Sequence, residues 1–213
     1  MTRFTTLALL AAALTAGAAT AQHPRPGQGA APAQAQPQGH IRGANPALAD
    51  PAKNPYGPYS FLVGDWTVGP ESGGEPMGVM RFKWGPNKSY LWISMNLLQG
   101  DKEEPHFEGL LVWNGLKKKL DMLITVDLQN GLVQEQGTLF VEKDGTVVRE
   151  IAAIASDGIR GPNAPAASTH FRQTFKEVGP DRILTNAMRD TGKGWVASFP
   201  GSDKLVMTRR AGA

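Results

Sequence analysis

The chain has 213 residues and no cysteine, which excludes a disulfide scaffold and a thiol nucleophile. Its 22 lysine and arginine residues against 19 aspartate and glutamate residues give a net charge of only +3, and the charges are interspersed. Nucleic acid is therefore not expected as a partner, because its binding needs a broad basic face.

The N-terminus combines Arg3, an apolar run from Leu7 to Leu14, and the sequence Ala19-Thr20-Ala21. A positive region, a short apolar core and an Ala-x-Ala site are the features of a secretory signal peptide. The apolar run is too short to span a bilayer as a mature helix. We therefore expect a cleaved signal peptide over residues 1–21, a periplasmic or secreted location, and no integral membrane segment in the mature chain.

Residues 22–57 are rich in proline, glutamine, alanine and glycine, and few of them could form a core. This composition predicts a disordered linker. Residues 58–210 carry strand patterns bounded by turn residues, without a convincing long amphipathic helix after Gly64. They are predicted to form one domain.

The clearest strand pattern lies at residues 119–127, where the even-numbered positions from Leu120 to Val126 are apolar. Alternation with a period of two predicts a strand with one buried face. Asn114-Gly115, Asn130-Gly131 and Asp144-Gly145 predict tight hairpin turns. After a first strand starting at Asp65, the expected strands are 79–84, 90–98, 106–113, 119–127, 132–142, 146–155, 169–178, 182–189, 195–199 and 205–209.

Short strands joined by hairpin turns predict an all-β fold, and a single up-and-down antiparallel β-barrel of about 8–10 strands is favoured over a sandwich. Closure removes exposed sheet edges, and a barrel of this size keeps room for a small cavity. Gly137, inside one expected strand, marks either a bulge or a bend of the barrel.

Several short motifs resemble the DUF1579-type family of calycin-like, or lipocalin-like, β-barrels. The resemblance covers about residues 58–210, and it implies a small closed barrel of largely unassigned function. It extends more distantly to nitrobindin and fatty-acid-binding-like barrels. The motifs are Leu62-Val63-Gly64-Asp65-Trp66, Phe82-Lys83-Trp84, Phe107-Glu108-Gly109 with Trp113-Asn114, and Met207-Thr208-Arg209.

The resemblance also implies structural roles for the Gly-x-Trp motif at Gly64 and Trp66. In calycins this tryptophan closes one end of the barrel against an arginine of the last strand, which corresponds here to Arg209 or Arg210. Such a contact is a cation–π arrangement and has no catalytic role. Nitrobindin-like proteins bind haem through a histidine near the C-terminal end, but the last histidine here is His170.

The strands carry more bulky aromatic and methionine side chains than a filled small barrel needs, which predicts an apolar pocket. The alternative is ordinary core filling, with the polar members facing solvent. We expect a small hydrophobic molecule as the partner, and a monomer or weak homodimer. The predicted ligand-binding residues are Trp84, Tyr90, Trp92, Met95, Trp113, Met122, His170, Phe171 and Arg172. Other strand positions that could present an inward polar group are Asn96, Gln134, Gln136, Gln173 and Asn186.

His106 and Glu108 are two residues apart, so on a regular strand their side chains share one face. With His170 they could form a two-histidine, one-carboxylate metal site. We expect no cofactor and no metal, and a divalent metal or haem held through His106, Glu108 and His170 is the alternative.

No Gly-x-Ser-x-Gly, His-Glu-x-x-His or phosphate-binding loop is found in the sequence. The favoured hypothesis is an exported barrel that binds a hydrophobic or aromatic molecule without chemistry. One alternative is a lyase, isomerase or hydratase that uses His170 or His106 with Glu108 for acid–base catalysis. Another is a cell-envelope module that presents an outer face of the barrel to a protein partner.

Overall fold

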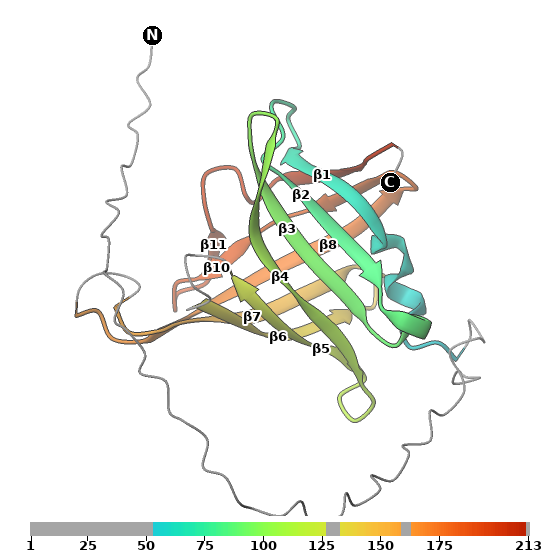
Figure 1. Ribbon diagram of the computed structural model, residues 1–213, viewed down its shortest axis with the longest axis horizontal. Helices are drawn as coiled ribbons and strands as arrows, with labels where there is room; N and C mark the ends of the chain where they lie inside the picture. Colours follow the sequence, from blue (N-terminus) through green and yellow to red (C-terminus); the bar gives the residue numbers. More distant parts are fainter. Residues whose placement is uncertain (1–52, 127–132, 159–162, 212–213) are drawn as a thin grey trace, which may run out of the picture. The chain divides into compact units, whose positions relative to one another are not determined.

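The computed structural model describes residues 53–126, 133–158 and 163–211, which are built almost entirely of β-strands (Figure 1). The predicted signal peptide, most of the predicted linker and the predicted turn at Asn130-Gly131 lie outside these ranges. Two short 3-10 helices are η1 (Gly57–Leu62) and η2 (Pro86–Lys88). The strands are β1 (Gly64–Pro70), β2 (Gly78–Trp84), β3 (Leu91–Gln99), β4 (Lys102–Asn114), β5 (Lys119–Val126), β6 (Val133–Val141), β7 (Val147–Ala155), β8 (Ala167–Gly179), β9 (Arg182–Thr185), β10 (Met188–Asp190), β11 (Trp195–Ala197) and β12 (Leu205–Arg209).

Strands β1 to β9 and β12 form one closed antiparallel barrel. From β1 to β9 each strand pairs with the next along the chain, and β12 closes the sheet by pairing with both β1 and β9. In Figure 1, β8 runs behind β2 to β4 as the far wall of the barrel. The all-β single-barrel fold predicted from the sequence is therefore confirmed.

Alternation along the strands places the core inside the barrel. In β5 the even-numbered residues from Leu120 to Val126 are all buried, while their neighbours are exposed or half-buried. Phe82 and Phe175 meet edge to face in the interior, with ring centroids 6.0 Å apart. The predicted strand at 119–127 is thus observed over Lys119–Val126, with its apolar face inward, and residue 127 lies outside the described ranges.

One end of the barrel is closed by η1 and the residues just before it. Tyr56, at the end of the predicted linker, is 2% exposed, and its hydroxyl donates to the Ser89 carbonyl at 2.7 Å and accepts from the Trp113 N–H at 2.9 Å. The Tyr59 hydroxyl donates to the Leu139 carbonyl at 3.3 Å, and burial raises the pKa of Tyr59 to about 12. These bonds connect Tyr56 and η1 to β4, to β6 and to the residue that follows η2.

Trp66 and Arg209 lie next to this closed end and contact each other. They face each other in the register of β1 and β12, and the Arg209 Cζ lies 4.1 Å from the Trp66 ring centroid. The Trp66 Nε1–H donates to the Leu62 carbonyl at 2.7 Å, and Arg209 Nη1 donates to the Val63 carbonyl at 3.0 Å. Gly64 has φ = 138°, and a Cβ on it would lie 2.4 Å from Arg209 Nη1. The geometry therefore favours glycine at this position.

The segment expected to be one strand at 182–189 is divided into β9 and β10. Strand β9 pairs with β12 and with the C-terminal half of β8, whereas β10 pairs with β11 and with the N-terminal half of β8. At the break, the Asn186 side chain accepts the Thr174 N–H at 2.9 Å. The Ala187 carbonyl accepts the hydroxyl of Ser202 at 2.7 Å. The β10–β11 hairpin therefore pairs with β8 outside the closed barrel. The hydrogen bond from Ser202 joins the segment between β11 and β12 to the break between β9 and β10.

Candidate functional site

A cavity of about 340 Å³, here called the inner cavity, lies inside the barrel toward the end away from η1. Its lining comes from strands around the barrel and from the segment that returns after the β10–β11 hairpin. Most of the lining is apolar, and three side chains with polar groups interrupt it. The lining residues are Val68, Met77, Met80, Met95, Leu97, His106, Phe107, Arg149, Gln173, Ala187, Phe199 and Leu205.

A β-bulge in β4 brings His106 to this cavity. Met95 pairs with Phe107 but Asn96 pairs with Pro105, so His106 is an extra residue on its strand. A bulge breaks the alternation of side chains. His106 and Phe107 both line the inner cavity, with ring centroids 5.7 Å apart. The sharing of one face by His106 and Glu108, expected from a regular strand, is therefore wrong, since Glu108 lies on the outer side.

Arg149 is the charged residue of the cavity lining, and it is 5% exposed. Its Nη2 forms an ion pair with the Glu135 carboxylate, and its Nη1 donates to Gln173 Oε1 at 3.0 Å. Gln173 Nε2 in turn donates to the Thr185 hydroxyl at 3.4 Å. The Arg149 Cζ also lies 5.0 Å from the Phe107 ring centroid. The guanidinium is thus buried with a carboxylate partner, as a buried charge requires.

The Arg149 Nε is a buried nitrogen without a hydrogen-bond partner among the described residues. Leaving a buried donor unpaired costs about 1–3 kcal/mol. The charged side chain of the cavity wall therefore has an unused donor.

Arg149 and Glu135 were not among the residues predicted from the sequence, although a signal was present. Arg149 follows Val147 and precedes Ile151 by two residues, and all three belong to the face of β7 that is buried. A charged residue at a position whose neighbours two residues away are apolar is a candidate for an inward polar group. Gln173, which the sequence placed among the possible inward groups, does line the cavity.

The predicted ligand-binding residues are distributed over the barrel. Met95 lines the inner cavity, and Met122 is buried in the core. Three residues, Trp84, Trp113 and Phe171, are half-buried and pack against the core. Trp84 meets Tyr56 edge to face near the closed end, with centroids 5.8 Å apart.

The other four predicted residues lie away from the inner cavity. The Tyr90 ring lies over Gly85, and Trp92 lines a hollow on the outer side of the barrel. His170 is exposed. Arg172 forms ion pairs at 2.7 Å with Glu142 and with Glu150. The structure therefore does not bring His170 together with His106 or Glu108, and the described ranges contain no cluster of three or more acidic or histidine residues that could hold a metal.

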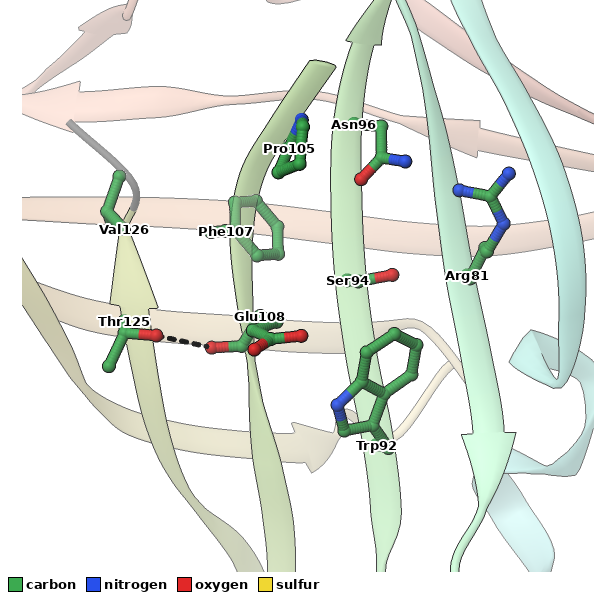
Figure 2. A pocket seen from close by; sticks show the side chains of 9 residues that line it. All are labelled: Arg81, Trp92, Ser94, Asn96, Pro105, Phe107, Glu108, Thr125 and Val126. Atoms are coloured by element: carbon green, nitrogen blue, oxygen red, sulfur yellow. Dashed lines mark hydrogen bonds between the residues drawn. The ribbon is translucent and has the colours of Figure 1, made fainter. Parts of the chain in front are cut away.

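A second hollow, of about 420 Å³ and here called the outer groove, lies along β2 to β5 (Figure 2). Register places Arg81, Ser94 and Glu108 side by side on three neighbouring strands. Figure 2 shows Ser94 at the centre, between Arg81 and Glu108, with Asn96 above it and Trp92 below it. The lining residues are Arg81, Trp92, Ser94, Asn96, Pro105, Phe107, Glu108, Thr125 and Val126.

An ion-pair network holds one side of the outer groove. Arg81 Nε contacts the Asp65 carboxylate at 3.0 Å, and Arg81 Nη2 contacts Glu103. Glu103 also accepts from Arg210 at 2.7 Å and from the Asn96 amide at 2.9 Å. The hydrogen bonds from Arg210 and Arg81 lower the pKa of Glu103 to about 2.

The low pKa of Glu103 predicts an acid-dependent loss of stability. The unfolded state, with a Glu103 pKa of 4.5, binds more protons than the folded state, so the contribution is complete above that pH and is lost as the pH falls toward 2. Glu103→Gln should therefore reduce the pH dependence of the free energy of unfolding in this window, measured by urea titration. Glu104→Gln, at an exposed neighbour outside the network, is the control. An unchanged pH dependence in Glu103→Gln would refute this assignment.

No protein-family model and no curated protein matches this sequence. Among the described residues, the helices are all too short to cross a membrane. The geometry of the barrel is therefore the basis for a functional proposal.

Proposed function

We propose that the protein is an exported binding protein whose inner cavity holds one small hydrophobic molecule. The observation that carries this proposal is an open space inside the barrel, walled by apolar side chains and by the buried guanidinium of Arg149. Ligand pockets combine such an apolar lining with a few polar groups that fix orientation.

The size and polarity of the cavity limit the ligand. Its volume of about 340 Å³ is near the lower end of ligand pockets, which favours a single ring system or a short chain. Apolar burial contributes roughly 25 cal/mol per Å². An oxygen acceptor on the ligand would match the unused Nε–H of Arg149. The proposed ligand is therefore mainly apolar, with a carbonyl, hydroxyl or carboxylate oxygen.

Binding without chemistry is favoured over the lyase, isomerase or hydratase alternative. His170 is exposed and Glu108 lies in the outer groove, so neither forms an acid–base pair with His106 in the cavity. The carboxylate of Glu135 is engaged by Arg149. Acid–base catalysis needs its groups within reach of the same reacting atoms.

We also propose that the protein is exported and that a disordered linker precedes the barrel. The N-terminal signal-peptide pattern and the linker composition support a periplasmic or secreted protein. The calycin-like motifs support a ligand-binding barrel of the calycin type. The contact of Trp66 with Arg209 agrees with this family assignment.

A protein-interaction role is the second candidate, and one observation favours it. Leu110, Val112 and Leu123 are exposed on the outer side of β4 and β5. Exposed apolar side chains that gather on one face are typical of interaction surfaces.

Filling part of the inner cavity tests the proposed function. Ala187→Phe puts a ring where Ala187 lines the cavity, so we expect the Kd for 2-naphthol, a fluorescent single ring system with a hydroxyl group, to rise at least about tenfold. Ala166→Phe adds the same ring at an exposed position and should leave the Kd unchanged. Fluorescence titration measures both values. Equal affinity in wild type and Ala187→Phe, or no saturable binding to wild type, would reject the inner cavity as the binding site.

A further inference from the structure

We propose that the outer groove is a second binding site, specific for a sugar ring. The site shares only Phe107 with the lining of the inner cavity, and it does not depend on the function proposed for that cavity. Five side chains surround it, from β2, β3 and β4, and each offers a different polar or aromatic group (Figure 2). These residues are Arg81, Trp92, Ser94, Asn96 and Glu108.

The polar side chains of the groove do not form hydrogen bonds with one another. Among the nine lining residues, the one hydrogen bond that involves a side chain joins the Thr125 hydroxyl to the main-chain carbonyl of Glu108, at 3.4 Å (Figure 2). The Ser94 hydroxyl, the Trp92 N–H and the Glu108 carboxylate therefore make no bond to each other. A hydroxyl donates and accepts, an indole N–H donates and a carboxylate accepts. The groove thus offers both donors and acceptors over a short distance.

The side chains of Arg81 and Asn96 are held in place by acidic residues outside the groove lining. Asp65 and Glu103 fix the Arg81 guanidinium, and the Asn96 amide N–H donates to Glu103 at 2.9 Å. The amide oxygen of Asn96 is then left as an acceptor. Two carboxylates compensate the charge of Arg81, and Glu108 adds a negative charge. The groove is therefore poorly suited to a phosphate or another anion.

Apolar surface lies directly beside these polar groups. The half-buried indole of Trp92 pairs in register with Leu110, which is 41% exposed, and Leu110 pairs with Leu123, which is 57% exposed. A sugar ring has an apolar C–H face that packs on an aromatic ring, and a rim of hydroxyls that donate and accept. The groove matches both features, whereas a purely apolar ligand would leave its polar groups unpaired.

Nuclear magnetic resonance of the mature ¹⁵N-labelled chain tests the proposal. The probes are triacetylchitotriose and maltotriose, each titrated up to about 20 mM so that a site with a Kd near 1 mM approaches saturation. We expect a saturable shift of the Trp92 indole N–H with at least one probe. Trp92→Leu, followed through main-chain amides of β3 and β4, should weaken binding at least about tenfold. Glu108→Ala, at an exposed position, should also weaken it and provides a second variant if Trp92→Leu does not fold.

Two controls separate this site from the rest of the barrel. Trp195→Leu removes a tryptophan that is 43% exposed and lies outside the groove, and it should keep the affinity. Ala187→Phe should keep it as well, because Ala187 lines only the inner cavity. The proposal is overturned if neither probe, nor any member of an immobilised glycan array, binds. It is also overturned if binding persists in both Trp92→Leu and Glu108→Ala. A third contradicting outcome is that the surface of Leu110 and Leu123 binds a second copy of the chain and excludes both probes.

Discussion

Arg149→Met is expected to lower the free energy of unfolding by about 3–5 kcal/mol, because it leaves the Glu135 carboxylate inside the barrel without its cation. Glu135→Gln should cost a similar amount, because the buried guanidinium loses its compensating charge. The side chains of this pair are only 6% and 13% exposed, so solvent can screen neither charge well. Urea unfolding followed by circular dichroism measures both changes.

The double variant Arg149→Met with Glu135→Leu distinguishes the energetic contribution of the ion pair from that of the surrounding packing. Replacing both members of a buried ion pair by apolar residues is often neutral or stabilising. We therefore expect the double variant to recover most of the stability lost in either single variant. If each single variant lost less than about 1 kcal/mol, as exposed ion pairs do, the pair would not be buried as the structure has it.

Gly137→Ala is expected to lower the free energy of unfolding by about 1–3 kcal/mol, the range for overpacking a close-packed site. A Cβ on Gly137 would lie 2.0 Å from the Glu150 carbonyl oxygen and 2.8 Å from Ile151 Cα. Both are main-chain atoms, so the strand itself would have to move. The pairing of β6 with β5 and β7 is regular through Gly137, so this glycine does not mark a bulge.

Gly179→Ala is the matched control for this change. No atom lies within 4 Å of a Cβ built on Gly179, so the substitution should alter stability by less than about 0.5 kcal/mol. Thermal unfolding compares the two variants with wild type. A Gly137→Ala variant as stable as Gly179→Ala would contradict the close approach of β6 to β7.

Local patterns were sufficient to predict the barrel. The alternation from Leu120 to Val126 identified the buried face of β5, and short turns between successive strands identified antiparallel neighbours. The pairing of Trp66 with Arg209 joins the first and last strands of the barrel. Only the family resemblance implied that contact, because no local pattern connects residues so far apart.

The site was harder to predict, because it depends on departures from regular alternation. The bulge at His106 reverses the side of the sheet on which the preceding residues lie. Its sequence signal is the adjacent Pro105, because proline within a sheet is confined to edge strands, strand starts and bulges. Trp92 and Met95 lie three residues apart on β3, so one faces outward and the other faces the cavity. An aromatic surplus therefore did not identify one pocket: part of it lines the outer groove, and part closes the end near η1.

Methyl NMR under xenon pressure tests most directly whether the barrel keeps an open, apolar interior. Xenon enters apolar cavities well below the size of this one. Labelled methionine methyls report its position, because Met77, Met80 and Met95 line the inner cavity while Met188 lies on β10, outside it. We predict shifts of the three lining methyls that saturate with pressure and are reduced in Ala187→Phe, with little change at Met188. Equal small changes at all methionines would contradict an open cavity and the binding function proposed for it.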